Sequence, residues 1–330
     1  MAAIPKLPPL KPGCVVVDRD HGIHTIVDEV GRGGLGLVYH ATSPEHGDVA
    51  IKVPRKLSHL ADLMLELRWV SGMQIPNTVI PIGMGEHEFA ELPDIPIPFI
   101  VMPLFPFGSI SDFIALRHQE NGDVHEFVPA FRFPIAIAAR WGVQVARALK
   151  RLEIVHRDIK PENLFLDSEH NAYLGDFGLA MPATPERRAV CSISVTNNPV
   201  GTVDYMSPEQ FACKANIDAR SDIYALGLLL FEMVTGTPAR AAYHPPKDGD
   251  SAKRAYDMSD LLNRDGYAIP LDHIGDRNLR RIIDRCTKPE IAKRYPDHDD
   301  FIADLMALAD MPSRLSPASR ASLVRGYTDT

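Results

Sequence analysis

The stretch HRDIKPEN holds residues whose types and spacing suit phosphoryl transfer. Asp158 could accept a proton from an attacking hydroxyl, Lys160 could stabilise charge on a transferred phosphoryl group, and Asn163 could bind a metal ion through its amide oxygen. Asp158 and Asn163 are five positions apart, so a curled loop would bring them to one site. The simplest interpretation of His156 is a core residue that orders the loop, and that of Arg157 is a surface salt bridge.

A second acidic residue, Asp176, begins the tripeptide DFG and follows NAYLG, which we expect to form a strand. Mg²⁺ is a hard cation that prefers oxygen ligands such as carboxylates. Asn163 and Asp176 are therefore the candidate metal ligands. Phe177 is better explained by packing than by chemistry.

The stretch VGRGGLGLVYHA places Gly31, Gly33 and Gly36 in a G-x-G-x-x-G frame. Glycine lets the backbone turn sharply and bring amide N–H groups close to phosphate oxygens. A dinucleotide-binding fold would need a helix directly after the glycines. Here LVYHA leads into another expected strand, so the pattern favours a hairpin that covers a ligand. A glycine-rich hairpin without a ligand is the alternative.

Lys52 stands between apolar residues in VAIK, on the strand expected after the glycine hairpin. Its ammonium could reach the α- and β-phosphates of a nucleotide. A carboxylate would have to hold it there, and the following helix offers Asp62 and Glu66. We choose Glu66 because Pro76 and Asn77 follow it at the spacing where the helix would hand over to the next strand. Asp62 is the second choice.

These residues must be positioned by an expected sheet followed by helices. The β-branched runs HTIVDEV, GLVYHA and DVAIKV predict an antiparallel sheet, which one amphipathic helix, SHLADLMLELRWVSG, interrupts. Two more strands are expected near TVIPIGMGE and PFIVMPLF. After Gly108 the pattern is helical, in SISDFIALRHQE, FRFPIAIAARWGVQVARALKRL and SDIYALGLLLFEMVTG. Strands first and helices afterwards predict an α+β fold of two lobes.

Composition narrows the functional classes. A net charge of −8 argues against nucleic acid as the main partner, because phosphate binding needs a basic surface. No stretch reaches the roughly 18 uninterrupted apolar residues of a membrane helix, and MAAIPKLPPL lacks the apolar core of a signal peptide. The four cysteines are far apart and form no metal or redox motif. We therefore expect a cytoplasmic protein without a membrane segment.

The glycine frame, the lysine, H-R-D-x-x-x-x-N and D-F-G follow one another in an order that resembles the eukaryotic-type (Hanks-type) Ser/Thr protein kinases, including bacterial members whose glycine loops often read similarly to GRGGLGLVY. The resemblance covers about residues 24–310. It implies a two-lobed fold, ATP with Mg²⁺ as cofactors, and transfer of the γ-phosphoryl group to Ser or Thr hydroxyls of proteins.

The resemblance also implies roles for single residues. Asp158 would be the catalytic base, Lys160 would assist the phosphoryl group, and Lys52 would pair with Glu66. The two candidate metal ligands would hold Mg²⁺. The nucleotide would lie among Gly31, Gly33 and Gly36 at the phosphates and Val38, Ala50, Phe165, the gatekeeper Met102 and the backbone of Pro103 to Phe105 at the adenine.

Residues farther along the chain carry the resemblance to the Ser/Thr subgroup, as Lys160 does. In GTVDYMSPEQ, Thr202 would contact Asp158 and Lys160, and Glu209 would pair with Arg294. Asp222 would hold the backbone of the catalytic loop. Two departures from the family pattern are Pro103, where an acid is common, and Ser207 in place of the alanine of A-P-E.

The segment between Asp176 and Glu209 would be the activation segment, and we expect autophosphorylation there. Arg157 resembles the arginine that binds an activation-segment phosphate in many family members. The candidate phosphorylation sites are Thr184, Ser192, Ser194 and Thr196.

Two other classes compete with this interpretation. Small-molecule kinases share H-x-D-x-x-x-x-N but generally lack GT-x-x-Y-x-x-PE, and a pseudokinase would have lost a catalytic Lys, Asp or Gly, none of which is lost here. We therefore expect an active protein kinase; its protein substrate and oligomeric state stay open.

The domain organisation follows from composition and from the resemblance. Residues 1–23 are expected to form a Pro-rich arm, extended rather than a packed element, that either lies on the domain or hangs free. Residues 24–310 would form the kinase domain, with lobes at 24–104 and 105–310. Residues 311–330 form a weakly ordered Ser/Arg-rich tail. Three long irregular segments are expected to be functional or mobile: 117–133, 181–200 and 237–272.

Overall fold

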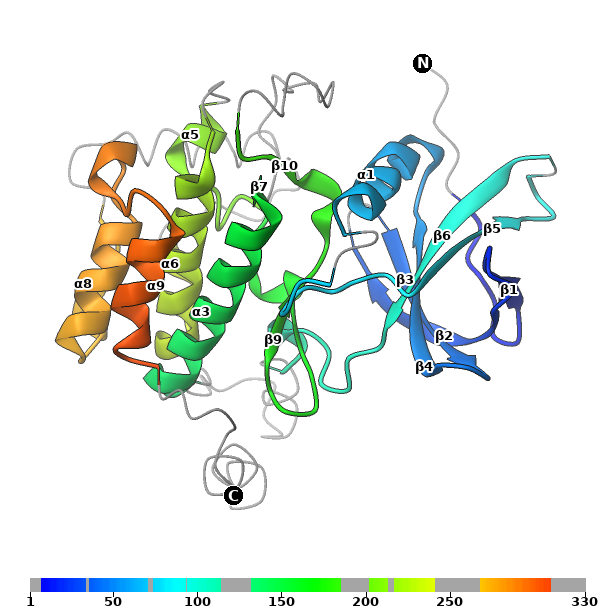
Figure 1. The fold of residues 1–330 in the computed structure, drawn as a ribbon, viewed down its shortest axis with the longest axis horizontal. Helices are drawn as coiled ribbons and strands as arrows, with labels where there is room; N and C mark the ends of the chain where they lie inside the picture. Colours follow the sequence, from blue (N-terminus) through cyan, green and yellow to red (C-terminus); the bar gives the residue numbers. More distant parts are fainter. Residues whose placement is uncertain are drawn as a thin grey trace, which may run out of the picture.

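The chain folds into a sheet-rich N-terminal lobe and a helical C-terminal lobe (Figure 1). This computed structural model describes residues 7–33, 36–70, 74–92, 94–113, 132–184, 202–212, 217–240 and 268–309. The predicted α+β architecture is confirmed. Most of the three irregular segments, and the whole of the predicted tail (311–330), lie outside the described residues.

The N-terminal lobe contains a six-stranded antiparallel sheet in the order β1-β2-β3-β4-β6-β5. Alternation of apolar residues builds these strands, since every second side chain points to the same face. The bounds are β1 (Val15–Val17), β2 (Ile23–Arg32), β3 (Gly36–Ser43), β4 (Gly47–Pro54), β5 (Gly83–Glu88) and β6 (Pro96–Pro103).

The first residues were expected to form an extended arm that either lies on the domain or hangs free, and the described part of this segment lies on the domain. Leu7 and Leu10 are 6% and 5% exposed and join the apolar cluster on one face of the sheet. The amide of Leu10 donates to the hydroxyl of Tyr39 at 3.1 Å. Strand β1 then pairs with β2, and Asp18 forms a bridge to Gly85 of β5, so the two ends of the sheet meet.

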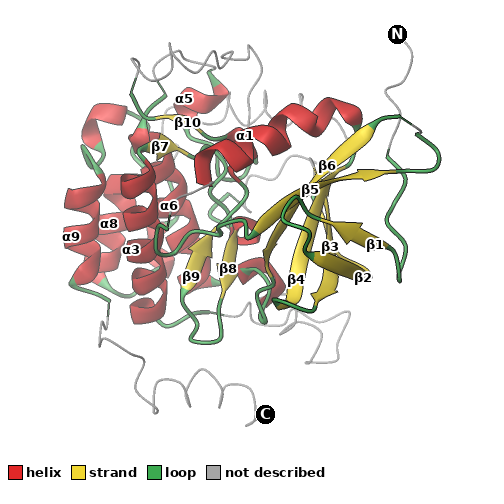
Figure 2. Ribbon diagram, turned by 45° about the vertical axis from the view of Figure 1, so that its right-hand side comes forward, coloured by secondary structure: helices red, strands yellow, loops and turns green. Residues whose placement is uncertain are grey.

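The opposite face of the sheet is covered by helix α1 (Leu60–Val70), the single helix predicted for this lobe (Figure 2). Leu63 and Leu67 of α1 are buried against Ile100 of β6. Glu66 lies between these two leucines on the same buried side of α1 and reaches Lys52 of β4.

The predicted strand TVIPIGMGE is only half correct. Strand β5 begins at Gly83, whereas Thr78 forms a bridge with Leu174 and the amide of Val79 donates to the Leu174 carbonyl oxygen at 2.8 Å. Pro81 lies between the two parts, and proline has no N–H to donate to a sheet ladder.

The C-terminal lobe packs its helices around α6 (Ala219–Thr235), which is buried along almost its whole length. An all-round apolar sequence such as YALGLLLF is typical of a central core helix. The predicted helix that begins at Ser109 is helical from Ile110 to Phe113, and its remainder lies outside the described residues. Helix bounds are α3 (Ile135–Leu152), α5 (Pro208–Phe211), α6 (Ala219–Thr235), α8 (Arg277–Cys286) and α9 (His298–Met306).

The described part of the C-terminal lobe also contains two short pairs of strands. Strand β7 pairs with β10 and β8 pairs with β9, both antiparallel (Figure 2). Their bounds are β7 (Ile154–Val155), β8 (Leu164–Leu166), β9 (Ala172–Leu174) and β10 (Met181–Pro182). In the described part of the chain, none of the helices has the length and apolar character needed to cross a membrane.

His298, the first residue of α9, makes stability depend on pH. Its side chain is buried, and burial lowers its pKa from 6.5 to about 4. The unfolded chain takes up a proton below pH 6.5, whereas the folded protein keeps this imidazole neutral until about pH 4, so stability falls as pH drops through this window. Between pH 7 and 5, wild type should lose about 2 kcal/mol more than His298→Gln. Urea unfolding at both pH values measures this difference; equal losses would contradict it.

Candidate active site

The loop that carries HRDIKPEN is fixed from beneath by helix α6. The carboxylate of Asp222 accepts hydrogen bonds from the backbone amides of His156 and Arg157 at 2.7 and 2.9 Å. Burial raises the pKa of Asp222 to about 7, although these two amides oppose the shift. This is the anchoring role predicted for Asp222. Arg157 takes the left-handed backbone conformation (φ 68°), which the two hydrogen bonds to Asp222 hold in place.

The predicted interpretation of His156 as a core residue is confirmed, whereas that of Arg157 is not. His156 is 0% exposed and its ring packs edge-on against Phe177. Its Nε2 lies 3.1 Å from the carbonyl oxygen of Gly175, one residue before Asp176. Arg157 is half-buried rather than on the surface, and its Nε donates to the Leu179 carbonyl oxygen at 2.6 Å.

Asp158 lies at the centre of a hydrogen-bond network. Its Oδ1 accepts from the amide and the hydroxyl of Thr202 at 2.7 and 2.8 Å, and its Oδ2 lies 2.8 Å from Nζ of Lys160. Lys160 also donates to the Thr202 hydroxyl at 2.8 Å. The predicted contacts of Thr202 with Asp158 and Lys160 are therefore present. At this distance the Asp158 carboxylate could accept a proton at the same reaction centre at which the Lys160 ammonium stabilises negative charge.

Asn163, in a single 3₁₀ turn (Pro161–Asn163), completes this network through its amide nitrogen. Its Nδ2 donates to the backbone oxygen of Asp158 at 2.8 Å and to Oδ2 at 3.1 Å. The backbone carbonyl oxygen of Asn163 accepts from the backbone amide of Gly175 at 2.9 Å, which connects the loop to the residue before Asp176. The two candidate metal ligands are thus brought together by backbone contacts.

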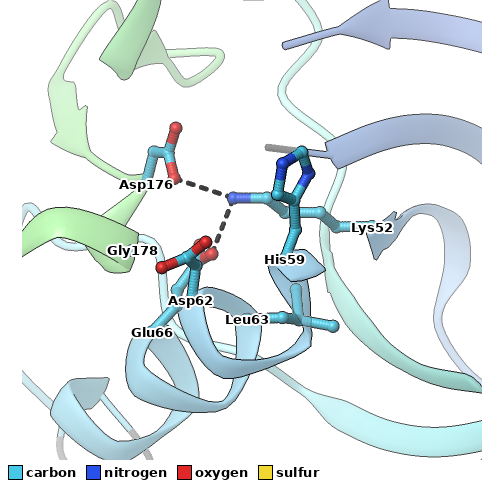
Figure 3. Close-up of a pocket in the computed structure, with 7 residues that line it drawn as sticks. All are labelled: Lys52, His59, Asp62, Leu63, Glu66, Asp176 and Gly178. Carbon is cyan, nitrogen blue, oxygen red and sulfur yellow. Dashed lines mark hydrogen bonds and ion pairs between the residues drawn. The ribbon is translucent and has the colours of Figure 1, made fainter. Parts of the chain in front are cut away.

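Lys52 on β4 forms ion pairs with two carboxylates from different parts of the chain (Figure 3). Its Nζ lies 2.6 Å from Glu66 and 2.8 Å from Asp176. Burial alone would lower the pKa of Lys52, but the two carboxylates outweigh this effect and raise it, so the ammonium stays charged. Asp62 lines the same pocket, yet the ion pair goes to Glu66, which confirms that choice.

Asp176 has the charge and exposure that a metal ligand needs. Burial opposes its ionisation, but Lys52 outweighs this effect and lowers the pKa of Asp176. Its side chain is 33% exposed, and the second carboxylate oxygen points away from Lys52 (Figure 3). Among the described residues, no group of three His, Cys, Asp or Glu side chains could hold a metal alone. The donor set fits Mg²⁺, which is usually bound by one or two protein ligands together with waters and phosphates.

The glycine frame forms the predicted hairpin between β2 and β3. Gly33 donates to the carbonyl oxygen of Gly36 at 3.0 Å, and a strand follows directly, as the hairpin interpretation requires. A Cβ added at Gly36 would lie 3.0 Å from the Val53 carbonyl oxygen and 3.3 Å from Cε of Lys52. Glycine at this position therefore allows the hairpin to lie directly against the lysine.

The profile of the family described as "Protein kinase domain" matches residues 24–301. The chain belongs to the protein kinase family. Similar proteins include the probable serine/threonine-protein kinase PknB of Lactococcus lactis, 28% identical over 310 residues that cover 92% of this chain and 44% of the relative. PknL of Mycobacterium tuberculosis is 33% identical over 233 residues, which cover 68% of this chain and 51% of the relative. This kinase chain thus spans about half the length of these relatives, or less.

The residues predicted to surround the adenine converge from four strands of the kinase domain. Val38 on β3 is the cross-strand partner of Lys52, and Ala50 on β4 is the partner of Met102 on β6. Phe165 on β8 lies 5.5 Å from Phe105, centroid to centroid. Their roles toward ATP stay predictions, and of this set the sheet register places Val38 directly beside Lys52.

The kinase domain contains a buried ion pair that was predicted and contacts that were missed. Glu209 and Arg294 are bidentate at 2.7 and 2.8 Å and almost fully buried. Gln210, which we did not single out, donates to the Arg157 carbonyl oxygen at 2.9 Å and thus joins α5 to the loop that carries HRDIKPEN. The sequence S-P-E-Q, a helix capping box, was the available signal for Gln210.

Proposed function

We propose that this chain is a serine/threonine protein kinase that transfers the γ-phosphoryl group of Mg-ATP to Ser and Thr hydroxyls of protein substrates. The observation that carries the proposal is the triangle of Asp158, Lys160 and Thr202, with each pair at hydrogen-bond distance. The relatives named as serine/threonine kinases support the choice of acceptor.

The proposed roles follow from position and charge. Asp158 would accept the proton of the acceptor hydroxyl, and Lys160, already ion-paired with it, would stabilise negative charge on the phosphoryl group. Lys52 would bind the nucleotide phosphates beneath the glycine hairpin. Mg²⁺ held by Asn163 and Asp176 would neutralise phosphate charge when bound. We further propose that the domain works in the cytoplasm, which supplies ATP and would keep its four dispersed cysteines reduced.

The test is to incubate the purified protein with Mg-ATP and dephosphorylated casein and to identify the phosphorylated residues by mass spectrometry. We expect phosphoserine and phosphothreonine with wild type and neither with Lys52→Met. ATP bound at micromolar affinity without transfer would instead favour a scaffold, and transfer only to a small-molecule alcohol would favour the small-molecule class.

We also propose that the kinase phosphorylates its own activation segment and is activated by doing so. Thr184 is an exposed described residue, and Ser192, Ser194 and Thr196 lie outside the described residues. The half-buried guanidinium of Arg157, beside Asp158, supports the idea of a phosphate contact there. Replacing all four hydroxyl residues with alanine should lower activity toward casein at least about tenfold, one lost charge-assisted contact being worth about 1.5–3 kcal/mol. The proposal would be contradicted if this variant gained as many phosphoryl groups as wild type and phosphorylated casein at the same rate.

A further inference from the structure

The turn that begins at Thr202 determines how the catalytic groups are held. The carbonyl oxygen of Thr202 accepts hydrogen bonds from the amides of Tyr205 and Met206 at 3.0 and 3.1 Å, which closes the turn. The amide and hydroxyl of the same residue bind Asp158. A displacement of this turn would therefore move the groups that orient Asp158 and Lys160.

Arg240, beyond the end of α6, binds this turn from the interior of the C-terminal lobe. Its side chain is 0% exposed. Nη1 donates to the carbonyl oxygen of Val203 at 2.8 Å, and Nη2 donates to that of Met206 at 2.7 Å. Nη2 also donates to the hydroxyl of Tyr224 on α6 at 3.0 Å. One guanidinium thus spans both ends of the turn and connects it to the central helix.

Aromatic rings hold this guanidinium in place. Its central carbon lies 5.6 Å from the ring centroid of Phe211 on α5 and 5.5 Å from that of Tyr224. The guanidinium of Arg294 also lies against Tyr224, with its central carbon 4.7 Å from the centroid of that ring. Tyr224 therefore contacts both the arginine that holds the turn and the arginine paired with Glu209. A cation beside aromatic faces is stabilised by the ring quadrupole, which offsets part of its desolvation cost.

The chemistry of arginine suits this position better than that of any other side chain. A guanidinium is always charged and presents its donors in a planar fork, so it can bind two carbonyl oxygens at once. A lysine ammonium acts as a point charge on a flexible stem and would have to leave one of them. A buried carbonyl oxygen without a donor costs stability, so the turn would adopt another arrangement to regain a partner.

We propose that Arg240 is a positioning residue for phosphoryl transfer. By fixing the carbonyl oxygens of Val203 and Met206, it keeps Thr202 where its amide and hydroxyl hold Asp158. The inference rests on the proposed kinase function. It predicts a defect in the use of the protein substrate rather than in the use of ATP, since Lys52 and the glycine hairpin belong to the other lobe.

The variants are Arg240→Met, Arg240→Lys and the matched control Arg280→Met. Arg280 on α8 also donates twice to a backbone oxygen, that of Ile274, but this contact is outside the turn. The measurements are kcat, KM for casein and KM for ATP, together with hydrogen exchange of the Tyr205 and Met206 amides. Exchange reports on the turn even if wild type transfers no phosphate, so a failure of the kinase proposal stays distinguishable.

We expect Arg240→Met to lower kcat/KM for casein at least about tenfold, because small misplacements of reacting groups are costly. KM for ATP should change less than about twofold, and the Tyr205 and Met206 amides should exchange faster. Arg240→Lys should recover part of both effects, and Arg280→Met should behave as wild type. Unchanged exchange in the turn, or an equal rise in KM for ATP, would overturn the proposal. If Arg240→Met does not fold, Arg240→Lys and Tyr224→Phe decide by the same criteria.

Discussion

Replacing Asp158 with asparagine is expected to lower kcat for phosphoryl transfer by about 10²–10⁴-fold, the range that a general base contributes. Asparagine keeps an oxygen that can accept the two bonds from Thr202, so the loop should keep its shape. It has no carboxylate to take the proton of the acceptor hydroxyl. Single-turnover transfer from Mg-ATP to casein measures the effect on the chemical step.

The matched control is Asp299→Asn, the same chemical change at an exposed ion pair with Lys150 on the far side of the lobe. This control should retain wild-type kcat. ATP affinity, measured by calorimetry, should be similar in wild type and Asp158→Asn, because the predicted nucleotide contacts come from other residues. A kcat within threefold of wild type for Asp158→Asn would show that another group accepts the proton.

Arg294→Met is expected to lower the free energy of unfolding by about 3–5 kcal/mol, the usual cost of breaking a buried ion pair by removing one partner. Arg294 and Glu209 are 0% and 1% exposed, so the remaining carboxylate would be left in the interior without its partner. Burial raises the pKa of Glu209, but Arg294 outweighs this effect and lowers it. Without the arginine that pKa should rise, so the variant's deficit should shrink as pH falls and Glu209 takes up a proton.

The double variant Glu209→Gln with Arg294→Met tests the cause. It carries no buried charge at this position and should be more stable than Arg294→Met alone. Urea unfolding of the four proteins of this cycle gives the coupling free energy directly. Additive losses would mean that the pair contributes through packing rather than through charge.

The sequence predicted best the features that depend on short motifs. Asp158, Lys160 and Asn163 lie within one loop, so their spacing alone placed them together. Lys52 and Glu66 lie on a strand and on the helix that follows it, and the spacing from Glu66 to Pro76 and Asn77 favoured Glu66 over Asp62. The approach of Asp176 to the same lysine was not predicted, since 124 positions separate the two residues.

Contacts that depend on tertiary packing were not predictable in this way. The Pro-rich start of the chain has no clear periodicity, yet Leu7 and Leu10 are buried because the open face of the sheet needs apolar cover. Arg240 falls in a segment predicted to be irregular, and the two turn residues whose carbonyl oxygens it binds lie 34 and 37 positions earlier. A charged residue in a segment predicted to be irregular is usually exposed. Composition therefore predicted neither the burial of the two leucines nor that of Arg240.

The meeting of β1 with β5 affects how other chains can associate with the N-terminal lobe. An outer strand of an open sheet offers unpaired N–H and C=O groups on which a foreign strand can assemble. At Gly85 these groups face the chain's own bridge to Asp18, and Met84 accepts from the amide of Arg19 at 2.8 Å. A protein trimmed to the residues of the family match would begin at position 24 and lose this cover. Such a trimmed protein would expose unpaired backbone groups along β5. Its self-association would be an artefact of the trimming rather than a property of the kinase.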